Sequence, residues 1–177
     1  AYLAFVSVAA AILYGYKYIA LSNERSANEG NILYNDSVIN HQWSKSFEFE
    51  ELFNNYSKKY LASSIYYFSF LRPLYELQIA RLFSKYPDYF NVFRSCNKGY
   101  GTNKWCNDCA KCLFTFIVLY PFLPKSKLIE IFGDNLFTKR TLLPIAKNLL
   151  SISGHKPFDC VGTKNEIIAA INMGILK

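Results

Sequence analysis

The residues best placed for chemistry are four cysteines that stand close together in the sequence: Cys96, Cys106, Cys109 and Cys112. The last three form two overlapping Cys-x-x-Cys pairs, and each such pair supplies two ligands from one tight turn. A glycine-containing loop separates the first cysteine from the others and can bring its sulfur back to them. Zinc prefers four thiolate or imidazole ligands in a tetrahedron. The pattern therefore predicts a closed, structural zinc site within residues 93–113.

Two other fates of these cysteines are possible. Disulfides would require an oxidising compartment, and nothing in the sequence indicates secretion. An iron–sulfur cluster can use a Cys-x-x-Cys-x-x-Cys run, but its usual form has a fourth Cys shortly downstream followed by Pro, which is absent here. The fifth cysteine, Cys160, is expected to be a small buried side chain.

Two polar segments carry side chains that could bind a ligand. Residues 18–21 form a short apolar run typical of an inner parallel strand, and the polar residues 22–31 follow it directly. Ligands of open α/β sheets bind beyond the carboxyl ends of the strands. Arg25 suits a carboxylate or a phosphate because its guanidinium forms a bidentate fork. The other candidates in this segment are Ser22, Glu24, Ser26, Asn28 and Asn31.

The second polar segment, residues 40–46, contributes Ser44 and places His41, Lys45 and Glu48 within a short stretch. His41 could act as an acid or a base, and Lys45 could meet an anion. The alternative for both segments is a solvated loop with surface ion pairs. Arg72 is a further candidate for ligand binding, although it could instead pair with Glu76 along a helix.

The composition indicates a folded chain with a basic surface. The 177 residues are 51% hydrophobic and 19% charged, with a net charge of +7 and a pI of about 9.1. The lysines are scattered, so nucleic acid is a less favoured partner than an anionic small molecule. The apolar start, residues 1–16, lacks the features of a signal peptide or a spanning helix and predicts a buried helix. Because it begins with Ala1, we expect residues upstream to be missing.

The hydrophobic pattern predicts a strand only near the start of the chain and helices over most of the rest. Expected helices begin near residue 46 and at Pro73 and cover residues 113–120, 126–132, 139–150 and 163–173, with Gly133 and Gly174 as helix stops. The predicted fold class is α/β. Residues 1–45 would be the end of a nucleotide-binding domain with a partial doubly wound parallel sheet, and residues 46–177 a mostly helical subdomain with the zinc site.

Several motifs together resemble one enzyme family. The run 22–28 after the strand, the run 40–46, the segment 95–97, the Trp105-Cys106-x-x-Cys109-x-x-Cys112 run and the segment 156–162 are similar to bacterial UDP-N-acetylmuramoyl-L-alanyl-L-glutamate epimerases. The cysteine arrangement alone also resembles 7-cyano-7-deazaguanine synthase. The two polar motifs favour the epimerase.

The resemblance implies an adenine nucleotide α-hydrolase-like fold and a cytoplasmic ATP pyrophosphatase. It implies inversion of the terminal L-glutamate of a UDP-linked muramoyl dipeptide in peptidoglycan precursor synthesis, with ATP, Mg²⁺ and a structural zinc ion. Adenylation would remove the charge of the carboxylate and make the α-proton easier to abstract. Candidates for this chemistry are His41, Lys45 and Glu24, with Arg25 beside them.

One departure from the family pattern matters. The resembling enzymes carry an early Ser-Gly-Gly-x-Asp-Ser phosphate-binding loop, and this sequence has none. We therefore expect a fragment that does not turn over ATP alone. Two alternatives remain at this point: a nucleobase-modifying ATP pyrophosphatase and a zinc-stabilised nucleic-acid-binding module.

Overall fold

The structure is a computed structural model that describes residues 1–30, 32–96, 98–152 and 157–177. It divides into two compact units. The first comprises residues 1–30 and 40–74, and the second comprises residues 75–177 together with the segment 31–39. The predicted domain boundary after residue 45 therefore lies inside the first unit.

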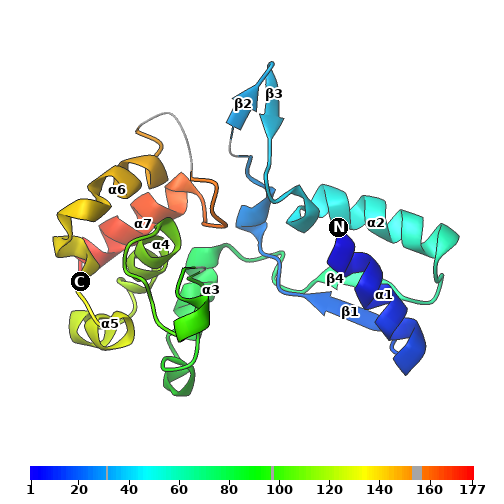
Figure 1. Ribbon diagram of the computed structural model, residues 1–177, viewed down its shortest axis with the longest axis horizontal. Helices are drawn as coiled ribbons and strands as arrows, with labels where there is room; N and C mark the ends of the chain where they lie inside the picture. Colours follow the sequence, from blue (N-terminus) through cyan, green and yellow to red (C-terminus); the bar gives the residue numbers. More distant parts are fainter. Residues whose placement is uncertain (31, 97, 153–156) are drawn as a thin grey trace. The chain divides into compact units, whose positions relative to one another are not determined.

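The first unit is built on a parallel pair of strands, β1 (Tyr18–Leu21) and β4 (Tyr66–Ser69), with Tyr18 opposite Tyr66. Helix α2 (Phe47–Tyr60) connects them, as a parallel pair requires a crossover connection. Helix α1 (Tyr2–Tyr14) precedes β1 and ends at Gly15, whose φ of 71° gives the left-handed cap (Figure 1). A helix and a strand form where they were predicted, but the prediction that the helix is buried is wrong: α1 buries only a stripe of small residues, Ala4, Val8 and Ala11, whereas Leu3 and Leu13 are exposed.

The two helices share one apolar core with the strands, in which α1 packs against β1 and α2 packs against β4. Ser46 caps α2 by accepting a hydrogen bond from the Phe49 N–H, and the helix then buries Phe49 and Phe53 on one stripe. The core residues of this unit are Ala4, Val8, Ala11, Phe49, Phe53, Ile65 and Tyr67. Strand β4 was not predicted, although its run of aromatic residues favours a strand.

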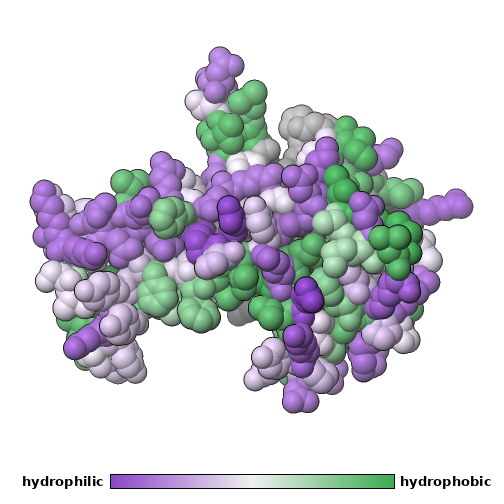
Figure 2. All heavy atoms as spheres, turned by 180° about the vertical axis from the view of Figure 1, so that it is seen from behind, coloured by the Kyte–Doolittle hydropathy of each residue, from purple (hydrophilic) through white to green (hydrophobic). Residues whose placement is uncertain are grey.

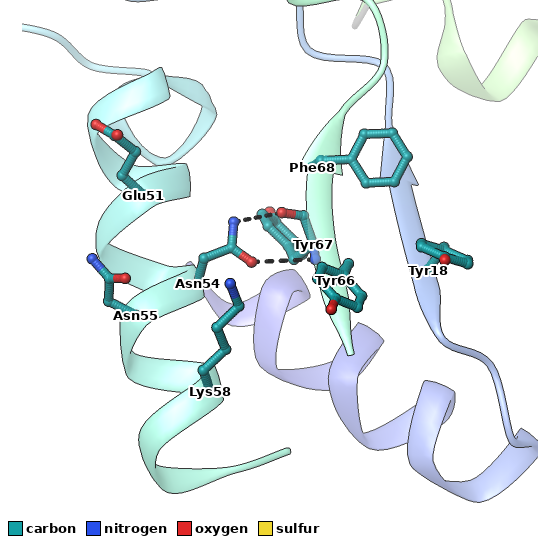
Figure 3. A pocket seen from close by; sticks show the side chains of 8 residues that line it. All are labelled: Tyr18, Glu51, Asn54, Asn55, Lys58, Tyr66, Tyr67 and Phe68. Carbon is teal, nitrogen blue, oxygen red and sulfur yellow. Dashed lines mark hydrogen bonds between the residues drawn. The ribbon is translucent and has the colours of Figure 1, made fainter. Parts of the chain in front are cut away.

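Strand β4 has its outer edge closed by a side chain (Figure 3). The N–H groups of Tyr66 and Phe70 donate toward β1, so the polar groups of Tyr67 point the other way. The Asn54 amide meets both of them: Nδ2 donates to the Tyr67 carbonyl at 2.5 Å, and Oδ1 accepts from the Tyr67 N–H at 3.3 Å. This pairing satisfies the outward-facing backbone groups of Tyr67 without a further strand.

A short antiparallel hairpin, β2 (Ile32–Tyr34) and β3 (Ser37–Ile39), was also not predicted. Its turn residues Asn35 and Asp36 both have positive φ values, 46° and 57°. Asn and Asp tolerate this conformation, so the Asn-Asp pair between two apolar runs is a hairpin signal that the sequence offered. Figure 2 shows hydrophobic side chains of the hairpin on the surface, below its hydrophilic tip.

The second unit surrounds a helix that is buried on most sides, α4 (Ala110–Leu119). It contacts four further helices: α3 (Glu76–Phe83), α5 (Lys125–Phe132), α6 (Leu143–Leu149) and α7 (Lys164–Ile175). Short 3₁₀ turns lie at Pro87–Tyr89, Tyr100–Thr102, Leu136–Thr138 and Arg140–Leu142. The buried helix predicted for residues 113–120 and the Gly133 stop are confirmed, and Thr163 caps α7 by accepting from the Glu166 N–H.

Three helix boundaries differ from the prediction. The helix expected at Pro73 begins at Glu76, because the Leu74 carbonyl accepts from the Arg25 N–H and residue 75 is extended. The helix expected over 139–150 starts only at Leu143, after a 3₁₀ turn and with a proline in its first turn. Helix α7 continues through Gly174 to residue 175, so this glycine is not its stop.

Within the described ranges, no helix combines the length and the apolar character needed to cross a membrane.

Candidate functional site

The two predicted polar segments lie at the carboxyl ends of the parallel strands. The 3₁₀ turn η1 (Arg25–Asn28) follows β1, Arg72 follows β4, and the turn η2 (Trp43–Lys45) lies against η1. Because β1 and β4 are parallel, their carboxyl ends share one edge of the sheet. These side chains therefore lie at the carboxyl edge of the sheet, where α/β proteins bind ligands.

One side chain, Arg72, connects all the segments at this edge. Its Nη1 donates to the Glu24 carbonyl at 2.9 Å, and its Nη2 donates to the Lys45 carbonyl at 2.7 Å. Nη2 also reaches the Glu50 carboxylate at 3.1 Å and the Ser69 hydroxyl at 3.2 Å. The side chains of the ion pair are only 14% and 10% exposed. Arg72 thus forms its ion pair with Glu50 and not with Glu76 of α3, which was the predicted alternative.

Two further hydrogen bonds hold the polar segments together. Asn40 Nδ2 donates to the Ala27 carbonyl at 2.9 Å. The Phe47 N–H, at the start of α2, donates to Asn28 Oδ1 at 2.8 Å. These bonds and the Arg72 contacts fix the backbone of η1 against the approach to α2.

A cavity of about 280 Å³ lies in this region. We call it the strand-end cavity, and it is lined by Arg25, Asn28, Phe47 and Arg72. Three of these residues were predicted as ligand-binding, so the fold brings them to one place. Phe47 was not predicted.

The remaining predicted residues of the two polar segments are spread around this edge. Ser26 is buried at 2% exposure, whereas Ser22 and His41 are exposed. The side chains of Glu24, Ser44 and Lys45 are half-buried. Asn31 lies outside the described residues.

Glu50 is the main residue of this region that sequence reasoning missed. It lies on the same stripe of α2 as Phe49 and Phe53 and is 8% exposed. A carboxylate on the buried stripe of an amphipathic helix requires a cation or hydrogen-bond donors. That signal was present in the sequence and indicated a cation or hydrogen-bond donors as the partner of Glu50.

A second cavity of the first unit, about 440 Å³, lies elsewhere. Figure 3 shows it between α2 and the two strands, with Tyr18 and Tyr66 stacked at 5.7 Å and Lys58 over the Tyr66 ring at 5.5 Å. These two tyrosines are the first residues of β1 and β4. This cavity therefore extends along β4 from the amino ends of the strands and includes none of the predicted site residues.

The four cysteines of the second unit converge on one point. Their Sγ atoms all lie within 4.8 Å of one another, in a set we call the cysteine cluster: Cys96, Cys106, Cys109 and Cys112. Three of the separations are 3.9 Å (Cys96–Cys109), 3.7 Å (Cys106–Cys112) and 3.5 Å (Cys109–Cys112). A disulfide would require about 2.05 Å, so the cysteines are free thiols.

The local backbone explains this convergence. Cys109 is the N-cap of α4, which puts Cys112 in its first turn. The Gly99 N–H donates to Cys96 Sγ at 3.3 Å, and the Asp108 N–H donates to Cys106 Sγ at 3.4 Å. A side chain at Gly99 would meet the Lys104 carbonyl, so only glycine fits this close turn.

The thiols of the cysteine cluster differ in acidity. Burial opposes ionisation of Cys96, but hydrogen bonds from Cys106 and Gly99 outweigh it and lower its pKa to about 7. Burial raises the pKa of Cys106 to about 11 and raises the pKa of Cys112 as well. A bound cation would favour the thiolate form of all of them.

Comparison with known proteins identifies the family. Residues 1–70 match the model of the MurL N-terminal domain, and residues 92–176 match the model of the MurL C-terminal domain. The chain therefore belongs to the MurL family, as its motifs predicted. All four clustered cysteines lie in the C-terminal match, and η1, η2 and α2 lie in the N-terminal match.

Three curated relatives are named for the epimerase that the motifs resemble. A UDP-N-acetyl-alpha-D-muramoyl-L-alanyl-L-glutamate epimerase of Micromonospora sp. is 40% identical over 95% of this chain and 38% of its own length. Those of Salinispora tropica and Xanthomonas oryzae pv. oryzae are 39% and 41% identical, over 95% and 91% of this chain and 38% and 37% of their own lengths. The chain thus spans less than two fifths of these relatives. No solved structure matches it.

Proposed function

We propose that this chain is part of an epimerase that inverts the terminal L-glutamate of UDP-N-acetylmuramoyl-L-alanyl-L-glutamate during peptidoglycan precursor synthesis. The observation that carries the proposal is identity of 39–41% to relatives of that name over almost the whole chain. The matched models and relatives do not name the two alternative functions, and no observation favours them.

The proposed reaction uses ATP with Mg²⁺. Cleavage of ATP to AMP and pyrophosphate would activate the glutamate carboxylate as an adenylate and so acidify the α-proton. An adenine nucleotide α-hydrolase-like fold has a parallel sheet with helices on its faces, and the parallel β1–α2–β4 unit is consistent with this. In open α/β sheets ligands bind at the carboxyl ends of the strands, where the candidate residues lie. The sequence lacks the phosphate-binding loop, so ATP cleavage would need residues outside these 177.

The candidate acid–base residues are His41, Lys45 and Glu24. Hydrogen bonds from one guanidinium hold the backbone carbonyls of Glu24 and Lys45, so their side chains start close together. His41 is exposed in the segment 40–46, and its imidazole can act as an acid or a base. We propose that these side chains face the reacting glutamate, with Ser22, Ser26, Asn31 and Ser44 among the substrate-binding groups.

A segment exchange tests this function. The 177-residue chain replaces the matching segment of the Micromonospora relative, and the hybrid is incubated with ATP and the UDP-linked dipeptide. We expect D-glutamate to appear in hydrolysed product analysed on a chiral column, and no turnover by the 177-residue chain alone. A hybrid that folds, binds ATP and leaves the glutamate entirely in the L form would reject the proposal.

We propose that the cysteine cluster binds one structural zinc ion. A tetrahedron with Zn–S bonds of about 2.3 Å has edges of about 3.8 Å, and the three sulfur separations quoted above agree with this. Four protein thiolates would complete the coordination, so the ion would stabilise the fold of the unit and leave no open position for a substrate. Free thiols and a nucleotide-linked substrate also fit a cytoplasmic protein.

Elemental analysis tests the metal. We expect one zinc per chain after purification, with at most a small fraction left in Cys106→Ser and full content in the control Cys160→Ser, whose cysteine is outside the cluster. Iron with inorganic sulfide, or no metal, would contradict the zinc proposal.

A further inference from the structure

The two edges of the β1–β4 sheet are not equivalent. The Tyr66 N–H donates to the Lys17 carbonyl at 2.8 Å, so in this parallel register the odd-numbered residues of β1 bond to β4. The backbone groups of Tyr18 and Ala20 therefore point to the opposite side, which we call the free edge of β1. Within the described ranges, no hydrogen bond from another segment reaches these backbone groups.

The outer edge of β4 is already occupied. Asn54 of α2 meets the outward N–H and carbonyl groups of Tyr67, and the Arg72 N–H donates to the Ser69 carbonyl at 3.2 Å. Figure 3 shows β4 between α2 and β1. A further strand beside β4 would have to displace these bonds, whereas a strand beside β1 would displace none.

The side chains of the sheet indicate that this pair of strands is part of a larger structure. Parallel sheets are covered on both faces, and two strands alone are rarely stable. One face of this sheet packs against α1 and α2 through Ile19 and Tyr67. The side chains of Tyr18, Ala20 and Tyr66 lie on the other face and are exposed. The sheet therefore lacks part of its covering as well as a neighbour for β1.

Helix α1 indicates the same side of the sheet. Phe5 lies on one flank of its buried stripe and packs against Phe53 of α2, with the ring centroids 5.1 Å apart. At 3.6 residues per turn, Leu3 and Tyr14 lie on the opposite flank, and both are 74% exposed. Because α1 packs under β1 and α2 under β4, this flank lies on the side of the free edge. Apolar side chains thus extend the packing layer beyond β1.

The length of related proteins indicates what pairs with the free edge. The three curated relatives are matched over only 37–38% of their lengths, so more than half of each has no counterpart in these 177 residues. N–H and carbonyl groups that project at alternate residues are the pairing pattern of a β-strand. A second copy of the chain would offer this edge only the four residues of its own β1.

We propose that β1 is an interior strand of a larger sheet, and that its free edge binds a β-strand from the part of a MurL-family protein outside these 177 residues. Strand β4 is then an edge strand of the complete sheet. One end of the added strand lies at the carboxyl edge of β1, next to the two polar segments, so it completes the candidate ligand site. The inference rests on family membership and the hydrogen-bond pattern, and it is independent of the proposed reaction.

Amide hydrogen exchange tests the inference at single residues. Exchange is measured on the 177-residue chain and on the hybrid enzyme by mass spectrometry with electron-transfer fragmentation. In the chain alone, the Ala20 N–H should exchange much faster than the Ile19 N–H, which bonds to β4. In the hybrid, the exchange rate of Ala20 relative to Ile19 should fall at least about tenfold, because a strand then covers the free edge.

A proline substitution provides a matched test of the free edge. Proline removes the outward N–H of residue 20 and is tolerated at sheet edges but not within a sheet. Ala20→Pro should therefore lower the unfolding midpoint of the hybrid at least about twice as much as that of the chain. The control Ala20→Ser retains the N–H with little change in size and should change both midpoints little.

A second variant tests the other edge. Asn54→Ala removes the side chain that meets the Tyr67 backbone. The Tyr67 N–H should then exchange faster in the chain and in the hybrid alike, because β4 has no neighbouring strand on that side.

Three results would overturn the inference. The first is an unchanged relative exchange rate of Ala20 between the chain and the hybrid, and the second is a protected Tyr67 N–H in the Asn54→Ala hybrid. The third is a dimer of the 177-residue chain, seen by sedimentation equilibrium, in which the Ala20 N–H is already protected; it would assign the edge to a second copy. None of these measurements requires turnover, so a folded hybrid that leaves the glutamate in the L form rejects only the proposed reaction.

Discussion

Arg72 shows how one side chain can determine the geometry of a ligand-binding edge. Its guanidinium has acceptors on the loop after β1, on η2, on α2 and at the end of β4. Lysine offers a single ammonium group on a flexible stem and lacks the planar fork of donors. The role therefore depends on the shape of arginine as well as on its charge.

Removal of this side chain should strongly destabilise the first unit. Arg72→Gln leaves the Glu50 carboxylate buried without its cation, at a cost of about 3–5 kcal/mol in the free energy of unfolding. Urea denaturation measures this cost.

The double variant Arg72→Gln/Glu50→Gln controls for the buried charge. We expect it to recover a large part of the loss, because no uncompensated carboxylate remains. Equal stability of the single and double variants would show that Glu50 and Arg72 are not energetically coupled.

At the scale of secondary-structure elements, two glycines near helix ends have different roles. Gly133 ends α5 with a φ of 79°, which an L side chain rarely adopts. Gly174 lies inside α7, and a Cβ there would come within 2.2 Å of the Tyr120 ring. It permits close packing of α7 against the end of α4.

Gly174→Ala should therefore destabilise the second unit although alanine favours helices. The gain in helix propensity, at most about 1 kcal/mol, is smaller than the cost of overpacking, about 1–3 kcal/mol. Thermal unfolding measures the sign. The control Gly101→Ala places its Cβ in open space and should change stability little. A stabilised Gly174→Ala variant would show that Tyr120 moves aside without cost.

At the scale of the whole molecule, the two units have separate apolar cores and one tryptophan each. In the first unit, the ring centroids of Trp43 and Phe49 are 5.2 Å apart. In the second unit, Trp105 is buried beside the cysteine cluster. Cys96 and Cys112 are themselves part of the second core. Metal binding and packing are thus coupled in that unit.

Removal of the bound zinc with a chelator should therefore lower the stability of the second unit and leave that of the first unit nearly unchanged. In the Trp43→Phe variant, fluorescence reports Trp105 alone, and EDTA should lower its unfolding midpoint because metal binding contributes to folding. In Trp105→Phe, the Trp43 signal should unfold at nearly the same denaturant concentration with and without EDTA. An equal shift of both signals would indicate a single cooperative unit.

Sequence reasoning predicted those features that depend on spacing along the chain. The overlapping Cys-x-x-Cys pairs and the loop before them required the sulfur atoms to converge, and they do. The Gly133 stop and the run 18–21 are likewise local signals with local consequences. The motifs in the two polar segments predicted the family.

The tertiary structure decided the features that depend on residues far apart in the sequence. Glu50 is the partner of Arg72 because β4 ends beside the first turn of α2, and Asn54, one turn further along that helix, meets the Tyr67 backbone for the same reason. Gly174 is a packing residue because α7 meets Tyr120. Hydrogen bonds and steric contacts act over a few ångströms, so the sequence alone determines them only where neighbours in the chain are also neighbours in space.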